Sequence, residues 1–174
     1  MSRPARRTRP AGTPSRGPSA VTSSPRPNFR AFSSGRGGTQ PVTWALVGLI
    51  WTIQLVHYPL FPLVGESTFP RYEAEHTRRM GWLLAIPASI EVATAAALVF
   101  VRPPGVSLAL VLTAGAVLAA LWVTTALVQV PLHRTLSRDP SPAAMRRLAA
   151  TNWVRTIGWT LRGGLVAIMV MQVG

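Results

Sequence analysis

Eight amide or ionisable side chains interrupt the long apolar stretches of this sequence, and they are its main candidates for chemistry. They are Gln54, His57, Glu91, Gln129, His133, Asn152, Arg155 and Arg162. Histidine can take up or release a proton near neutral pH, and a guanidinium group can stabilise negative charge that develops on an oxygen atom. These residue types suit a buried binding or acid–base site. They equally suit hydrogen bonds that only hold helices together.

The elements that must position these side chains are four apolar runs, at residues 42–61, 82–101, 106–130 and 153–173. Each run has 20 to 25 residues, and a helix of that length crosses a hydrocarbon core of about 30 Å at about 1.5 Å per residue. The sequence therefore predicts an all-α fold, a four-helix transmembrane bundle over residues 41–174. We expect a multi-pass protein of the cell membrane, with the lipid bilayer as its main partner.

Residues 1–40 have a different composition. They contain eight of the 18 basic residues, all of which are arginine, among many Pro, Ser and Gly. Such a segment buries too little apolar surface to offset its backbone entropy, so we predict a disordered tail. Few aromatic residues accompany the arginines, which argues against nucleic-acid binding. The eight arginines of the tail favour a cytoplasmic N-terminus, because positive charge is usually enriched on the cytoplasmic side of a membrane protein. Other arginines close to the spans lie on the side of the membrane opposite to the tail.

Two longer polar segments, 64–81 and 131–152, are expected on the same side of the membrane, because only a short turn joins the second and third spans. Glu75 and Arg79 stand four residues apart, the spacing of an ion pair on one helix face. The second segment has a proline-containing turn followed by a run of helix-forming residues. We expect both segments to be partly helical and to cover one mouth of the bundle, or to lie as polar helices at the interface.

The depth of two charges predicts an ion pair. Glu91 is nine residues from Trp82, and Arg162 is ten residues from Asn152, so both lie about 14–15 Å from the loop-bearing face. An unpaired charge there is costly, and the two should therefore pair inside the bundle. Arg155 shares a helix face with Arg162, and together with Gln54 and His57 it should lie nearer the loops. The result would be a polar funnel.

The sequence leaves three roles open for this polar interior. It could hold the helices in register, bind a small lipophilic aromatic ligand, or form a metal or haem site from His57, His76 and His133. No His-x-x-x-His or His-x-x-Glu pair occurs, so we expect no metal and no cofactor. The absence of cysteine excludes disulfides, thiol nucleophiles and cysteine-ligated clusters.

Two stretches resemble a known family. The segment 128–136 reads VQVPLHRTL, and the segment 151–156 reads TNWVRT. They resemble the small four-helix membrane domain that includes the anthrone oxygenases of aromatic polyketide pathways, with Asn152, Arg155 and Thr156 matching its motif. Gln129 and His133 stand where that family usually has asparagine, and Thr151 replaces a tryptophan.

The resemblance implies a candidate reaction, the oxygenation of an aromatic anthrone without metal or flavin. Such chemistry needs a base and a cation that holds an oxyanion. His57 or His133 would be the base, Arg155 the stabilising cation, and Asn152 would orient the substrate oxygen. Gln54, Glu91, Gln129, Asn152 and Arg162 are the candidate ligand-binding residues. The sequence leaves open whether the protein is an enzyme or a membrane protein without turnover.

Overall fold

The structure is a computed structural model that describes residues 36–173. All regular elements in this range are helices, and four of the helical segments are long and apolar enough to cross a membrane. The all-α prediction with four membrane-spanning helices is confirmed. Most of the predicted tail, residues 1–35, lies outside the described residues. Helix α2 begins at Arg36, somewhat before the boundary at residue 41 that composition suggested.

The first span combines three consecutive helical segments. Helix α2 (Arg36–Thr52) continues into the π-helical turn η1 (Ile53–His57) and the 3-10 segment η2 (Tyr58–Leu63). Pro59 follows η1 and cannot donate a backbone hydrogen bond to the preceding turn. The π-helical turn η1 lies just before the end of the span. Gln54 in η1 and Tyr58 at the start of η2 are both buried.

The second span is longer than its apolar run. Helix α3 (Phe69–Phe100) has 32 residues, so most of the segment 64–81, expected to be partly helical, is the first part of this helix. Glu75 accepts hydrogen bonds from Arg78 and Arg79 there, and its Oε1 atom lies 2.6 Å from Nε of Arg79. The predicted Glu75–Arg79 pair is therefore present. The helix remains α-helical through Pro87.

The third span resembles the first in its construction. Helix α4 (Leu108–Thr124) leads into the π-helical turn η3 (Thr125–Gln129) and then into α5 (Val130–Leu136), with Pro131 at the start of α5. Ser107 caps the beginning of α4 by accepting a hydrogen bond from Leu110 N. The turn before it contains Gly105 at φ +90°, a conformation that favours glycine.

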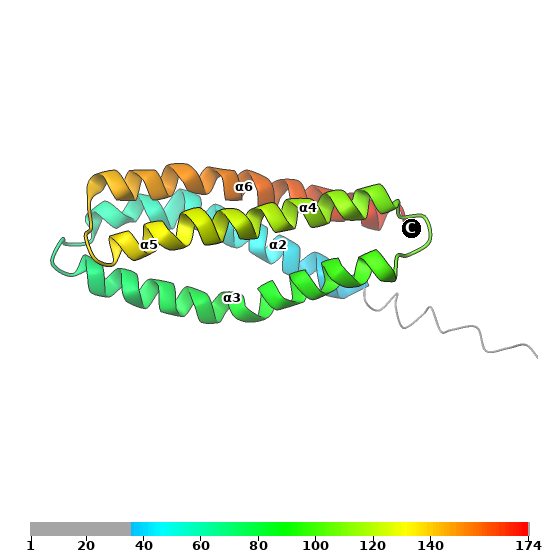
Figure 1. Ribbon diagram of the computed structural model, residues 1–174, viewed down its shortest axis with the longest axis horizontal. Helices are drawn as coiled ribbons and strands as arrows, with labels where there is room; N and C mark the ends of the chain where they lie inside the picture. The colour runs from blue at the N-terminus through cyan, green and yellow to red at the C-terminus, as the bar shows by residue number, and fades with distance from the viewer. Residues whose placement is uncertain (1–35, 174) are drawn as a thin grey trace, which may run out of the picture.

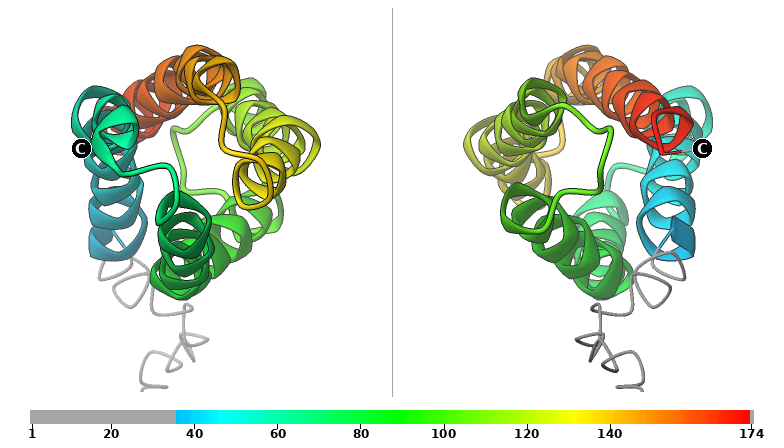
Figure 2. Two further views of the ribbon diagram at one scale, coloured as in Figure 1. Left: turned by 90° about the vertical axis from the view of Figure 1, so that its left-hand side faces the viewer. Right: turned by 90° about the vertical axis from the view of Figure 1, so that its right-hand side faces the viewer.

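Helix α6 (Pro142–Met171) forms the fourth span and begins with Ser141 as its N-cap. It packs most extensively on α2 and α4, whereas α3 packs on α2 and α4 on the other side of the bundle. Seen from either end, the four long helices form a ring (Figure 2). The connections 64–68 and 137–141 lie together at one end, and the turn 101–107 lies at the other (Figure 1). We call the first of these the loop-bearing end.

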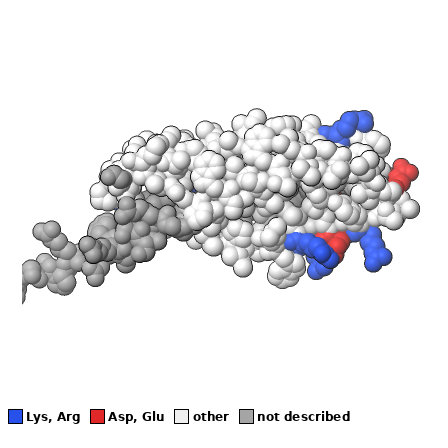
Figure 3. Space-filling model, turned by 180° about the vertical axis from the view of Figure 1, so that it is seen from behind, with Lys and Arg blue, Asp and Glu red and all other residues white. Residues whose placement is uncertain are grey.

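The outer surface suits a lipid environment. Large apolar side chains are exposed along the helices, including Trp82, Ile86, Phe100 and Leu127. On the face in Figure 3, the charged residues gather at the loop-bearing end and the remainder of the described surface carries none. Two clusters of buried apolar residues lie inside, and the larger one includes Phe61, Phe69, Leu136 and Leu148 near the loop-bearing end. This arrangement is that of a multi-pass membrane protein.

Candidate functional site

Glu91 and Arg162 form the predicted ion pair. Nε of Arg162 donates to Oε2 of Glu91 at 2.8 Å, and Nη2 donates to the same oxygen at 2.5 Å. Nη1 donates to the carbonyl oxygen of Ala114 at 2.9 Å, and Thr43 donates to the other carboxylate oxygen. Glu91 is fully buried, and Arg162 is nearly so. We call these groups the deep pair, and its charge and hydrogen bonds are satisfied within the bundle.

A second group, the amide network, joins the first and fourth spans. Asn152 Nδ2 donates to Gln54 Oε1 at 2.9 Å, and Gln54 Nε2 donates to the carbonyl oxygen of Ala149 at 3.2 Å. Arg155 Nη1 donates to Asn152 Oδ1 at 2.9 Å. Gln54 and Asn152 are both buried. The three residues named by the sequence are thus connected: Asn152 and Arg155 lie about one helical turn apart on α6, and Gln54 reaches Asn152 from η1.

Gln129 lies in the same layer but contacts a different neighbour. Its Nε2 atom donates to Thr151 Oγ1 at 3.0 Å, while its Oε1 atom is buried and has no partner among the described residues. The Nε atom of Arg155 is also buried without a partner in that part of the chain. Buried polar atoms are normally hydrogen-bonded, so these two atoms distinguish this layer from the deep pair.

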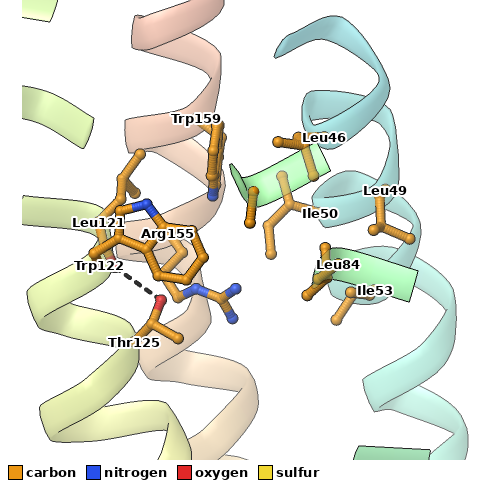
Figure 4. Close-up of a pocket in the computed structure, with 11 residues that line it drawn as sticks. Leu46, Leu49, Ile50, Ile53, Leu84, Leu121, Trp122, Thr125, Arg155 and Trp159 are labelled. Carbon is orange, nitrogen blue, oxygen red and sulfur yellow. Dashed lines mark hydrogen bonds between the residues drawn. The ribbon is translucent and has the colours of Figure 1, made fainter. Parts of the chain in front are cut away.

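An apolar cavity of about 50 Å³ separates the two groups. All four spans contribute to its wall, which consists of Leu46, Leu49, Ile50, Ile53, Leu84, Ala88, Leu121, Trp122, Thr125, Arg155 and Trp159. The guanidinium group of Arg155 projects from α6 into this space, between Thr125 and the aliphatic residues of α2 and α3 (Figure 4). The polar interior is therefore two polar layers with an apolar layer between them, where the sequence suggested one continuous funnel.

A third group, the histidine cluster, lies toward the loop-bearing end. His133 Nδ1 bonds Glu73 Oε1, and His133 Nε2 lies 3.2 Å from the Tyr58 hydroxyl oxygen. His57 Nε2 lies 3.0 Å from His76 Nδ1, and the two rings stack at a centroid distance of 4.3 Å. Of the two candidate bases, His133 is linked through Tyr58 to Arg155. His57 is engaged with His76 instead.

Among the residues that the structure describes, no group of three or more His, Cys, Asp or Glu side chains is arranged to hold a metal ion. Four imidazole nitrogens of the cluster take part in hydrogen bonds: His57 Nε2 with His76 Nδ1, and the two nitrogens of His133 with Glu73 and Tyr58.

Sequence reasoning missed Glu73 and Tyr58 as members of the site. Glu73 belongs to the polar segment 64–81, yet its side chain is fully buried in α3. A signal was present, because Glu73 and Glu91 are 18 residues apart, which is five turns at about 3.6 residues per turn. A helix continued back from the second apolar run would have placed both carboxylates on the same inward face.

No family model, curated protein or solved structure matches this chain. The four apolar spans and the buried polar groups define its class, a multi-pass membrane protein with ionisable side chains inside the bundle.

Proposed function

We propose that this membrane protein binds a small lipophilic molecule at the cavity beside Arg155, through an anionic or carbonyl oxygen of that molecule. The observation that supports the proposal is a partly buried cation at the wall of an apolar cavity, with its buried Nε atom unsatisfied and no carboxylate paired with it in residues 36–173. Intramembrane ionisable groups of this kind are functional-site candidates.

Arg162 provides an internal comparison. The two arginines are seven residues apart on one face of α6, and their partners differ. Arg162 is neutralised by Glu91 and also bonds a carbonyl oxygen. Arg155 donates to an amide oxygen and interacts with the Tyr58 hydroxyl, both of which are neutral partners. A ligand oxygen would supply at Arg155 the hydrogen-bond acceptor, and when anionic the negative charge, that Glu91 supplies at Arg162.

The size of the cavity limits what can enter without movement. About 50 Å³ holds small molecules of a few atoms, whereas sites for drug-sized ligands usually enclose about 300–1,000 Å³. An aromatic ring therefore requires one wall to move. We expect helix α3 to be the wall that moves. Only 6% of its most apolar stretch is buried inside the bundle, less than in any other span. Leu84 and Ala88 are its side chains at the cavity.

Binding of 2-naphthoate and of 2-methylnaphthalene to the full chain in nanodiscs tests the proposal. The two probes share a ring system and differ in the anionic oxygen atoms. Trp122 and Trp159 line the cavity and report binding by their fluorescence. We expect the wild type to prefer naphthoate by roughly tenfold, the worth of one charged hydrogen bond.

Arg155→Gln should remove that preference, because it removes the cation. Arg147→Gln is the matched control, since Arg147 lies on the same helix but is exposed, and it should behave like the wild type. Equal preference for naphthoate in the wild type and in Arg155→Gln would refute the proposed role of Arg155.

A second candidate function is a cofactor-independent oxygenase of the anthrone type. It is favoured by one observation, that the residues matching the family motif converge: Asn152, Arg155 and Thr156 all contact Gln54 or one another. In this reaction anthrone and dioxygen give anthraquinone and water. A base removes a proton from the anthrone methylene carbon, the carbanion reacts with dioxygen, and Arg155 stabilises the negative oxygen. His133 would be the base.

Oxygen uptake by membranes containing the protein tests this candidate. With anthrone supplied, we expect uptake equal to the anthraquinone formed, and a loss of at least about tenfold in Arg155→Gln, the effect of removing one charge-stabilising donor. A wild type that consumes no oxygen above control membranes excludes anthrone as the substrate and leaves the binding proposal to its own test.

The localisation remains a prediction. The cell membrane and a cytoplasmic N-terminus are inferred from the tail arginines and Arg102. Seven arginines near the loop-bearing end favour the reverse orientation, and they are Arg71, Arg78, Arg79, Arg134, Arg138, Arg146 and Arg147.

A further inference from the structure

Glu73, His133 and Tyr58 form a hydrogen-bonded chain that connects three spans and ends beside Arg155. Glu73 is on α3, His133 is on α5, and Tyr58 begins η2. Glu73 and Tyr58 are buried, and the His133 side chain is only 15% exposed. The Tyr58 hydroxyl also interacts with the Arg155 guanidinium. A carboxylate and an imidazole are thus connected through Tyr58 to Arg155, which lines the proposed ligand site.

The carboxylate determines which nitrogen of His133 has the proton. A carboxylate accepts hydrogen bonds, so the Nδ1 atom that faces Glu73 must be the donor. The Nε2 atom is then the basic nitrogen, and it accepts a hydrogen bond from the Tyr58 hydroxyl at 3.2 Å. An acid–histidine pair in this order orients the imidazole and stabilises the imidazolium that forms when it gains a proton.

The surroundings of His133 contain further titratable groups. Those that contact it or interact with it electrostatically are Tyr58, Glu73, His57 and His76, with Arg155 next to Tyr58. Glu73 is the one acidic residue among them. Its second oxygen, Oε2, is buried and has no hydrogen-bond partner in residues 36–173. The negative charge available to an imidazolium is therefore that of Glu73.

We propose that Glu73, His133 and Tyr58 act as a proton relay that ionises the hydroxyl group of a lipophilic weak acid bound at Arg155. The inference rests on the proposed function and names its ligand class. The ligand O–H bond breaks as its proton passes to the Tyr58 oxygen, while the Tyr58 proton passes to Nε2 of His133. The ligand oxyanion is then paired with Arg155, and the imidazolium is paired with Glu73.

The net charge of the site does not change in this step. Before transfer the site contains one guanidinium and one carboxylate, and afterwards it contains two cations and two anions. A bundle interior tolerates such a step better than one that leaves an isolated charge, because an unpaired charge in a low-dielectric medium is costly. Glu73 acts through His133 and is a positioning residue.

An alkyl-substituted 4-nitrophenol is the probe, because its phenolate is coloured and its phenol form is not. The full chain in nanodiscs is titrated with it at a fixed pH below that at which the free probe ionises. Tryptophan fluorescence reports binding, and visible absorbance reports ionisation. We expect the bound probe to show a phenolate-to-phenol ratio roughly tenfold above that of the free probe, equivalent to about 1.4 kcal/mol.

Glu73→Gln should lower this ratio several-fold while the probe still binds, because the amide cannot stabilise an imidazolium. Tyr58→Phe should lower it as well by removing the middle of the relay, and it provides a second test if Glu73→Gln does not fold. Glu75→Gln is the matched control. Glu75 is two residues away on α3, but it pairs with exposed arginines, so this variant should retain the wild-type ratio.

The outcomes separate the relay from the binding site. If the probe binds to the wild type and the ratio is unchanged in Glu73→Gln and Tyr58→Phe, the relay is wrong and the Arg155 site remains. If the probe binds but is not ionised, the relay is likewise wrong. If neither the nitrophenol nor 2-naphthoate binds to the wild type, the proposed function fails and the relay fails with it.

Discussion

Two arginines on one face of α6 differ in the partners that the bundle gives to their charges. Arg162 donates hydrogen bonds to the carboxylate of Glu91 and to the carbonyl oxygen of Ala114, and Thr43 donates to the same carboxylate. Arg155 meets an amide and a phenol at the edge of a cavity. The first arrangement satisfies its own charge and donors. The second has unused hydrogen-bonding capacity, which the proposed ligand would use.

The deep pair should behave as one unit in stability measurements. Glu91→Gln and Arg162→Gln should each destabilise the protein by about 3 kcal/mol, because each leaves an uncompensated buried charge. The double variant should be more stable than the less stable single variant, since two neutral amides can bond one another. Thermal unfolding in detergent is the measurement.

The exposed pair Glu75 and Arg79 is the control for this experiment. It has the same residue types on α3 but lies at the surface, where ion pairs contribute little because water and salt screen them. Glu75→Gln should leave the unfolding temperature unchanged within error. A double variant of the deep pair that is no more stable than the worse single variant would contradict a mutual dependence of Glu91 and Arg162.

At the scale of elements, α3 differs most from its sequence prediction. The apolar run begins at residue 82, but the helix begins at Phe69. At about 1.5 Å per residue its 32 residues span about 48 Å, which exceeds the hydrocarbon core by several turns. Hydropathy detects the part of a helix that lies in lipid. It does not detect the continuation into the polar region, and the continuation contains Glu73.

Helix α3 should also control access to the cavity, because it is the least buried span and supplies Leu84 and Ala88 to the wall. Ala88→Leu adds three carbon atoms to a cavity of about 50 Å³. We expect it to weaken 2-naphthoate binding by at least about tenfold, in line with the cost of overfilling a packed interior. Titration by tryptophan fluorescence is the measurement.

Ala93→Leu makes the same chemical change on the exposed side of α3 and should leave binding unchanged. If the two variants bound naphthoate equally well, the cavity would not be the binding site. A loss in both would indicate a general effect on the helix.

At the scale of the whole molecule, the bundle brings distant parts of the chain into contact. Gln54 and Asn152 are 98 positions apart and share a hydrogen bond, and Glu73 and His133 are 60 positions apart. The second span leads the chain away from the loop-bearing end and the third span leads it back. The connections 64–68 and 137–141 therefore lie together at that end (Figure 1), and both contacts become possible. The basic residues near these connections give that end its charge (Figure 3).

The sequence by itself determined the four spans and the pairing of Glu91 with Arg162. Apolar length specifies a span, and the cost of an isolated charge at a known depth requires a partner at the same depth. It also placed Asn152, Arg155 and Arg162 on one face, since the helical period alone decides that.

Only the tertiary structure decided how the remaining polar groups divide. Periodicity gives the direction of a side chain on its own helix but not the rotation or spacing of neighbouring helices. Those depend on how Ile50, Leu121 and Trp159 pack between the spans. That packing leaves a cavity beside Arg155, and the apolar side chains around the cavity separate Arg155 from the deep pair. It also buries Glu73 against His133, because the carboxylate of a helix extended beyond the membrane core meets a histidine from another span.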